Sequence, residues 1–368
     1  MGTDGFVVSH RRVVGALSAF LSLTAAVSVG SCSTGAPAPR DTAPDLHVNH
    51  FHLCESKLRT GDLAGALEHL RAYQRQARQL AAREPGNLSH QLAESYGYSN
   101  VAAIYQRQGN LQAASDSFRQ SIVLQDRLLS RSAVDLDVKH RRAVCLIHRG
   151  VILRALGETD LAEQVLDAAL VETEAMTQLD SSNVNWLRAF ASANVAAARL
   201  DLDGERTLEA IDRLHASRAI LSALLKQHPA RVAVLRDLAN VHVHLADALR
   251  AERRLAAASR EIGAAAAVAR RMSAERDHDT LRTLAAVRAG SGALAMAYGD
   301  RWQATVDYEA AAGVLRLTIP DTRDHHVLEL WTRIMLALGR GFDARQTFAR
   351  LDEMGFREPS LMALRAPK

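Results

Sequence analysis

Small residues recur at a nearly constant interval along this chain of 368 residues. The interval is 48 residues over the first five members and then 46 and 40, and the members are Ala66, Ala114, Ala162, Ala210, Ala258, Ala304 and Ala344. A larger apolar residue stands four positions after each of them: Leu70, Phe118, Leu166, Leu214, Ile262, Tyr308 and Phe348. A self-similar period of this size is typical of solenoids, in which each repeat buries its apolar face against its neighbours. One repeat array is therefore expected to occupy most of the chain.

Each repeat has the pattern of two helices joined by a turn. The turn before each alanine usually carries glycine, with Arg253 in its place once: Gly61, Gly109, Gly157, Gly204, Gly299 and Gly339. Prolines inside the array, Pro85, Pro229 and Pro320, fall only between units, where they interrupt no helix. The chain is 48% hydrophobic but only 5% aromatic, which favours closely packed helices over a β-sandwich. We expect an all-α array of seven units over residues 46–357, each with two helices of about 20 residues, and a C-terminal cap or tail over 358–368.

A small residue also recurs in the first helix of each unit, where the second helix would approach closely: Cys54, Ala102, Gly150, Ala197, Ala246, Gly292 and Thr332. With the turn and alanine rows, these residues resemble the tetratricopeptide repeat, a helix–turn–helix family whose usual unit is about 34 residues. The resemblance implies a right-handed α-solenoid of about seven repeats. Because the units here are longer, both helices should extend by about two turns. Long-unit arrays of this kind resemble those attached to some bacterial signalling proteins.

The resemblance also implies a concave groove, lined by the first helices, that binds a peptide or a helix of a partner. The family's groove positions give these polar members: Glu55, Ser99, Gln106, Arg154, Asn194, Asp201, Asp247 and Arg250. Asn100 lies where related peptide clamps carry an asparagine that bonds the ligand backbone. Exposure to solvent is expected in particular for Gln106, Arg154, Asn194 and Arg250. The alternative interpretation is a solvated helix face of mixed charge, with binding through the convex side or the edges.

Residues 1–31 have the pattern of a signal peptide or a membrane anchor. Arg11 and Arg12 precede an uncharged apolar run over residues 13–29, which is short for a hydrocarbon core of about 30 Å. The stretch Val29-Gly30-Ser31-Cys32 resembles the lipobox of bacterial lipoproteins, which implies lipidation of Cys32. A lipoprotein, an uncleaved anchor and an ordinary cleaved signal remain alternatives. Each places the array in the cell envelope, facing the periplasm, behind a flexible tether over residues 32–45.

The cysteines and histidines of the array are expected to serve packing or to lie at the surface. Cys54 and Cys145 lie two repeats apart, about 20 Å at 8–10 Å per helix layer, which is too far for a disulfide. Both are therefore predicted to be reduced, buried thiols. His325, His326 and Glu329 come closest to a metal-binding spacing, but they lack the two-histidine, one-face pattern of a helical zinc site. No metal site, cofactor or catalytic residue is predicted.

The net charge and the motifs of the chain limit the functions that it can have. The chain carries a net charge of +4, of which residues 1–31 supply +1, and no basic block with interleaved aromatics points to nucleic acid. The sequence thus favours a non-catalytic protein-interaction scaffold or adaptor, attached to the membrane by an N-terminal lipid or anchor. One alternative is a homo-oligomer that stacks through the exposed ends of units 1 and 7. Another is an all-helical, glycan-active enzyme, which would need convergent carboxylates on a closed ring, whereas an open solenoid is expected.

Overall fold

The computed structural model describes residues 45–365, apart from residue 60 and residues 132–134 and 273–276. Within these ranges the chain forms helices and no strands. The helices that open the units are α2 (Asp45–Arg59), α4 (Leu88–Arg107), α6 (Leu136–Leu156), α8 (Val184–Asp203), α10 (Val232–Ala251), α12 (His278–Ala297) and α14 (His325–Ala337). Those that close the units are α3 (Leu63–Arg83), α5 (Leu111–Arg131), α7 (Thr159–Leu179), α9 (Thr207–Gln227), α11 (Leu255–Arg270), α13 (Arg301–Leu315) and α15 (Gly341–Glu353), and the short α16 (Pro359–Met362) follows.

These helices confirm the all-α solenoid of seven helix–turn–helix units over the described part of the chain. Helices α3 to α10 have 20 or 21 residues each, as the long period predicts. The last unit is shorter, with 13 residues in each of α14 and α15. Pro85, Pro229 and Pro320 lie in connections between units, as predicted.

The alanine row that defines the period forms the contact between helices. All seven members are 0% or 1% exposed. In the first helices, small residues let the second helix approach: a Cβ built on Gly150 would lie 2.6 Å from Cδ2 of Leu166, sixteen residues later. Such close approach buries apolar surface along two long helices, and this burial is the main source of stability in a packed core.

Unit 4 differs from the predicted register by one residue. The turn residues with positive φ are Gly61, Gly109, Gly157, Gly299 and Gly339, together with Arg253 and Glu205. Gly204, predicted for this role, has φ −90°, so Glu205 (φ 60°) makes the left-handed turn. Likewise Ala198, rather than Ala197, packs in one core cluster with Leu214. Both corrections restore the constant interval between units, because a turn at 205 places the whole first helix one residue later.

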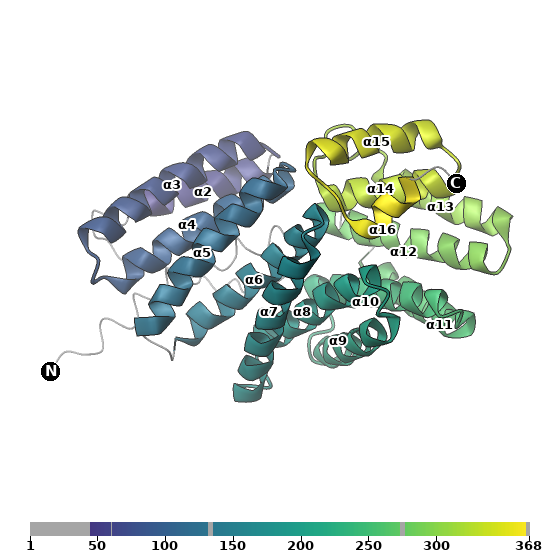
Figure 1. Ribbon diagram of the computed structural model, residues 1–368, viewed down its shortest axis with the longest axis horizontal. Coiled ribbons are helices and arrows are strands. Elements are labelled where there is room, and N and C mark those ends of the chain that lie inside the picture. Colours follow the sequence, from purple (N-terminus) through teal and green to yellow (C-terminus); the bar gives the residue numbers. More distant parts are fainter. Residues whose placement is uncertain (1–44, 60, 132–134, 273–276, 366–368) are drawn as a thin grey trace.

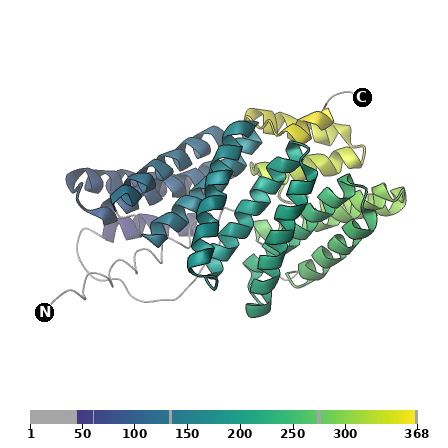
Figure 2. The ribbon, with the colours of Figure 1, turned by 60° about the horizontal axis from the view of Figure 1, so that its bottom comes forward.

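The array curls so that its last unit returns to units 2 and 3 (Figures 1 and 2). We call residues 354–361 the C-terminal clasp. Phe356 and Leu361 of the clasp share one hydrophobic cluster with residues of α4 to α8. The backbone N–H of Arg357 donates to the carbonyl of Ala155 at 2.7 Å, and the side chain of Met354 packs against Gly109. The expectation of an open solenoid was therefore wrong.

The N-terminal predictions concern residues that the structure does not describe. The signal or anchor over 1–31, Cys32 and the tether lie outside the described residues, except for Asp45, which begins α2. Among the helices that the structure does describe, none combines the length and the apolar character needed to cross a bilayer.

Candidate partner-binding inner surface

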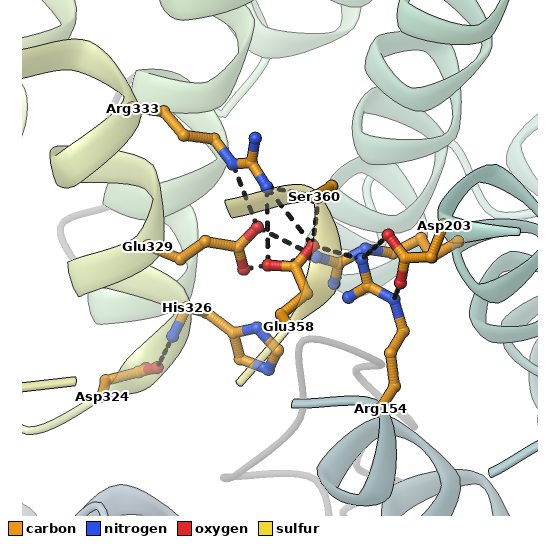
Figure 3. Close-up of polar contacts among 9 residues, drawn as sticks. Arg154, Asp203, Asp324, His326, Glu329, Arg333, Glu358 and Ser360 are labelled. Carbon is orange, nitrogen blue, oxygen red and sulfur yellow. Dashed lines mark hydrogen bonds and ion pairs between the residues drawn. The ribbon is translucent and has the colours of Figure 1, made fainter. Parts of the chain in front are cut away.

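The first helices of units 3, 4 and 7 meet the clasp in a network of buried charges (Figure 3). Arg154, near the end of α6, places Nη2 2.5 Å from Oε1 of Glu358. Its Nε lies 2.6 Å from Oδ2 of Asp203, the last residue of α8. The side chains of Glu358, Asp203 and Arg154 are only 1%, 3% and 8% exposed. The two residues of the first pair are 204 positions apart in the chain, so this contact closes the array.

The other half of the network comes from α14. Arg333 forms ion pairs with Glu329 and Glu358, each at 3.3 Å, and donates to Oγ of Ser360 at 2.7 Å. Arg199 of α8 reaches Glu329 at 3.3 Å. Three arginines thus face three carboxylates, and their formal charges cancel. Because both signs are present in equal number, the network avoids an unpaired buried charge, which would be strongly destabilising.

The electrostatics of the network keep Glu329 ionised. Burial acts to raise the pKa of Glu329, but the positive charges of Arg199, Arg333 and Arg154 outweigh it and hold the pKa well below its ordinary value. A carboxylate that stays ionised in this way cannot serve as a general acid near neutral pH. Convergent carboxylates do occur on the closed array, but each is paired with arginine, as in a structural tie.

Most of the predicted groove residues are buried, which corrects the expectation of exposure. None of the following is more than 6% exposed: Ser99, Asn100, Gln106, Arg154, Asn194 and Asp201. Ser99 donates to the carbonyl of Tyr96 at 3.2 Å, and Asn194 donates to the carbonyl of Phe190 at 2.9 Å, so each hydroxyl or amide bonds its own helix. Asp201 accepts from Arg206 and Arg213 at the α8–α9 turn.

Three predicted residues keep accessible side chains. Glu55 of α2 is 32% exposed and lies 3.5 Å from His52, far along the chain from the others. Asp247 and Arg250 of α10 are 42% and 39% exposed and lie 3.4 Å apart. Only these two predicted residues are brought together in accessible form.

The Asp247–Arg250 pair belongs to a surface that the closed array surrounds. Burial raises the pKa of Asp247, while Arg250 and then Arg333 of α14 lower it, so the charge of Arg333 acts on this carboxylate. Arg333 itself is 33% exposed. Met296, at the position of α12 that matches Arg250 of α10, is 46% exposed. We call Asp247, Arg250, Met296 and Arg333 the inner surface.

Sequence reasoning missed several of the residues that meet at the centre. Arg199 was missed because the predicted register of unit 4 is one residue early; in the corrected register, Arg199 follows the small residue Ala198 directly, as Asp247 follows Ala246. Asp203 occupies no groove position in either register, since the corrected one places Leu202 there. Glu329 and Arg333 lie at groove offsets around Thr332, and the period could have identified them. Glu358 follows the last repeat, and no periodic signal marks it.

The cysteines of the array and the two adjacent histidines of α14 are buried. Cys54 and Cys145 are buried free thiols, as predicted, and burial raises their pKa values to about 12 and about 11. His325 and His326 are 1% and 8% exposed. Within the described ranges, no group of three or more histidine, cysteine, aspartate or glutamate side chains is arranged to hold a metal ion.

Comparison with known proteins shows the fold. Neither a protein-family model nor a curated protein matches the chain. A Rap protein complexed with Competence and Sporulation Factor is similar, with a TM-score of 0.55 and 13% identity over 89% of this chain and 78% of that one. PilF of Pseudomonas aeruginosa has a TM-score of 0.42 and 15% identity over 77% and 96% of the two chains. BtubC from P. vanneervenii has a TM-score of 0.43 and 14% identity over 70% and 94%. The fold is thus a tetratricopeptide-like helical solenoid.

Proposed function

We propose that this protein is a non-catalytic interaction scaffold that binds a peptide or helix of a partner protein on the inner surface of units 5 to 7. The observation that carries the proposal is the Asp247–Arg250 pair, which keeps about two fifths of each side chain accessible on a face that the closed array surrounds. The similar Rap structure, which is complexed with a named factor, supports a binding role for this fold.

The chemistry of the inner surface indicates the kind of partner. Asp247, Arg250 and Arg333 offer charges of both signs, and Met296 offers an adaptable apolar contact. An amphipathic segment with one cation, one anion and an apolar side chain at helical spacing would complement these groups. Because the charges are half exposed, they contribute to specificity and orientation more than to affinity.

The test is cross-linked affinity capture from a cell-envelope extract with the full chain as bait. The test variant exchanges the charges of the inner pair, Asp247→Arg with Arg250→Asp. The matched control exchanges Asp116 and Arg119 of α5, which form the same i,i+3 pair at 3.5 Å with 53% and 50% exposure. Both changes affect accessible side chains, so both variants are expected to fold.

The proposal is supported if the unaltered chain and the control both capture a partner that the inner-pair variant binds about tenfold or more weakly. The inner surface would then be the binding site. Equal capture by all three baits would contradict the proposal and leave the convex face or the edges as the binding surface.

We also propose that the array faces the periplasm and is attached through the N-terminus, as the lipobox-like stretch ending at Cys32 and the apolar run before it suggest. Incorporation of labelled palmitate that is lost in Cys32→Ala would support the lipidated form. Label in the variant, or in neither chain, would argue for an uncleaved anchor or a cleaved signal.

Self-association is a second candidate, favoured by one observation. Trp302 and Phe342 stand three residues after the turn glycines of units 6 and 7 and are 74% and 65% exposed. Exposed aromatic side chains at equivalent positions of adjacent units are typical of interaction surfaces. Stacking through the free end of unit 7 is disfavoured, because that unit packs on units 2 and 3. Size measurements at rising protein concentration, with Trp302→Ser and Phe342→Ser as the comparison, test this candidate.

A further inference from the structure

Two adjacent histidines lie buried at the start of α14, and the ring of the first contacts the clasp. The rings of His325 and His326 are 3.9 Å apart between centroids, and the His325 ring lies 6.0 Å from that of Phe356 in the clasp. Both ring nitrogens of His325, and Nε2 of His326, are buried and have no hydrogen-bond partner within the part of the chain that the structure describes. A buried polar group without a partner reduces stability, so a packing role alone does not account for two histidines here.

The charged groups around the two rings oppose their protonation. Asp324 and Glu329 of α14 would favour a proton, but Asp324 already accepts from the backbone of His326 at 2.9 Å and pairs with His278 of α12 at 3.0 Å. Glu329 is engaged by Arg199 and Arg333. Arg199 of α8 and Arg282 of α12 repel an added positive charge. The first turn of a helix also disfavours cations, because of the orientation of its dipole.

We propose that the His325–His326 pair is a proton sensor that releases the C-terminal clasp when the surroundings become acidic. Release moves Phe356 away from the His325 ring, which admits water and allows protonation. The network of three arginines and three carboxylates has no spare negative charge to neutralise the two new positive charges. This inference depends on the geometry of the clasp and needs no partner protein.

The direction of the effect follows from linkage. Burial is the largest cause that lowers the pKa values of His325 and His326 in the closed form, against about 6.5 for a solvated histidine. The charge of His325 lowers the pKa of His326 further, and Arg199 and Arg282 lower the pKa of both. At pH values between the lowered pKa of the closed form and the pKa of about 6.5 of the open form, the open form therefore binds more protons. Closure weakens as the pH falls below about 6.5. Each titrating histidine shifts the ratio of closed to open forms by up to about tenfold per pH unit. Above that pH the histidines are neutral in both forms and closure is independent of pH.

The test is hydrogen–deuterium exchange of the full chain at about pH 7.5 and about pH 5.5, which lie on both sides of the ordinary histidine pKa of about 6.5. Exchange times are corrected for the pH dependence of the intrinsic rate of amide exchange. The reporter is the amide of Arg357, which donates to Ala155 across the closure. We expect this amide to lose protection by about tenfold or more at the lower pH, while amides of α8 and α9 stay protected.

The test variant is His325→Phe with His326→Phe, which keeps two rings and removes no hydrogen bond of a ring nitrogen that the structure shows. It should stay protected at both pH values. The control is His148→Phe, since His148 is also buried, stacks on Phe118 at 5.4 Å and has an unpartnered Nε2, but lies on α6. The control should still open in acid.

Unchanged protection of Arg357 in the unaltered chain at the lower pH would overturn the proposal. Equal loss in the double variant would also overturn it, and so would loss of protection throughout the array at the same pH. Because the unaltered chain is measured at both pH values, unchanged protection of Arg357 and loss of protection throughout the array can both be read even if the double variant fails to fold.

Discussion

At the residue scale, the lesson of this protein is that polar side chains at groove positions are used to tie the array to itself. Arg154 is the clearest case, because it sits at a predicted ligand position but is covered by Asp203 and Glu358. Of the other buried members, Ser99 and Asn194 bond their own helix, and Asp201 bonds the adjoining turn. Whether a polar residue at a groove position is buried or exposed can therefore be decided only when its neighbours in space are known.

Removal of one charge from the network should be costly. Glu358→Gln leaves three arginines facing two carboxylates in a buried site, so we expect the free energy of unfolding to fall by about 3 kcal/mol. Glu353→Gln is the control, since Glu353 is 64% exposed in its pair with Arg323, and its loss should change stability by less than about 0.5 kcal/mol. Urea denaturation measures both. A Glu358→Gln variant as stable as the control would show that the network does not hold the closure.

At the element scale, stability comes from long helices that approach closely at small residues. The second helix of each unit contacts the first at a position sixteen residues earlier, as Leu166 contacts Gly150 and Tyr308 contacts Gly292. The left-handed turn before each second helix sets this register, and glycine adopts that conformation without steric cost. Glu205 and Arg253 adopt it as well, which shows that packing along the helices can impose an unfavourable turn.

Adding one methyl group should have opposite effects at two helical glycines. In Gly150→Ala the new Cβ would lie 2.6 Å from both Cγ and Cδ2 of Leu166, so overpacking should destabilise the protein by about 1–3 kcal/mol. In Gly263→Ala the Cβ meets nothing within 4 Å, and the better helix former should stabilise it by about 0.5–1 kcal/mol. Thermal and urea unfolding compare the two. Stabilisation by Gly150→Ala would contradict the close approach of α6 and α7.

At the scale of the whole molecule, closure joins units that are distant in sequence. One hydrophobic cluster runs from α4 to α8 and includes Leu328, Phe348 and Leu351 of the last unit, as well as residues of the clasp. In an open solenoid each repeat contacts only its neighbours and stability is nearly additive along the array. Here the last unit also stabilises units 2 and 3, so we expect unfolding to be more cooperative than in an open array.

Loss of the clasp contacts should open the ring while the helices remain. Phe356→Ser combined with Glu358→Ser removes both the apolar and the ionic contact, and we expect the radius of gyration to rise by a few ångströms, against about 20 Å for a compact chain of this length. Small-angle X-ray scattering measures the change, and circular dichroism should show unchanged helicity. Leu364→Ser is the control, because Leu364 follows the clasp directly and is 50% exposed. An unchanged radius in the double variant would mean that closure does not depend on the clasp.

The sequence by itself determined the repeat. Helix propensity and the turn glycines are local features of each unit, and the units recur at a long, nearly constant interval. The number of helices, most of their lengths and the buried alanine row from Ala66 to Ala344 were therefore predictable. Ala197 and Gly204 were assigned one residue too early, because the turn of unit 4 was placed at its glycine instead of at the position that the constant interval requires. Glu205 occupies that position and makes the turn.

Only the tertiary structure decided which groove residues are accessible and where the chain closes. Curvature is the sum of small rotations between successive units, and no local pattern specifies that sum. The contact between Arg154 and Glu358 spans 204 residues and exists only because the accumulated rotation brings the clasp back to unit 3. The same rotation buries Arg154 and leaves Asp247 and Arg250 accessible, although all three occupy polar groove positions in their units.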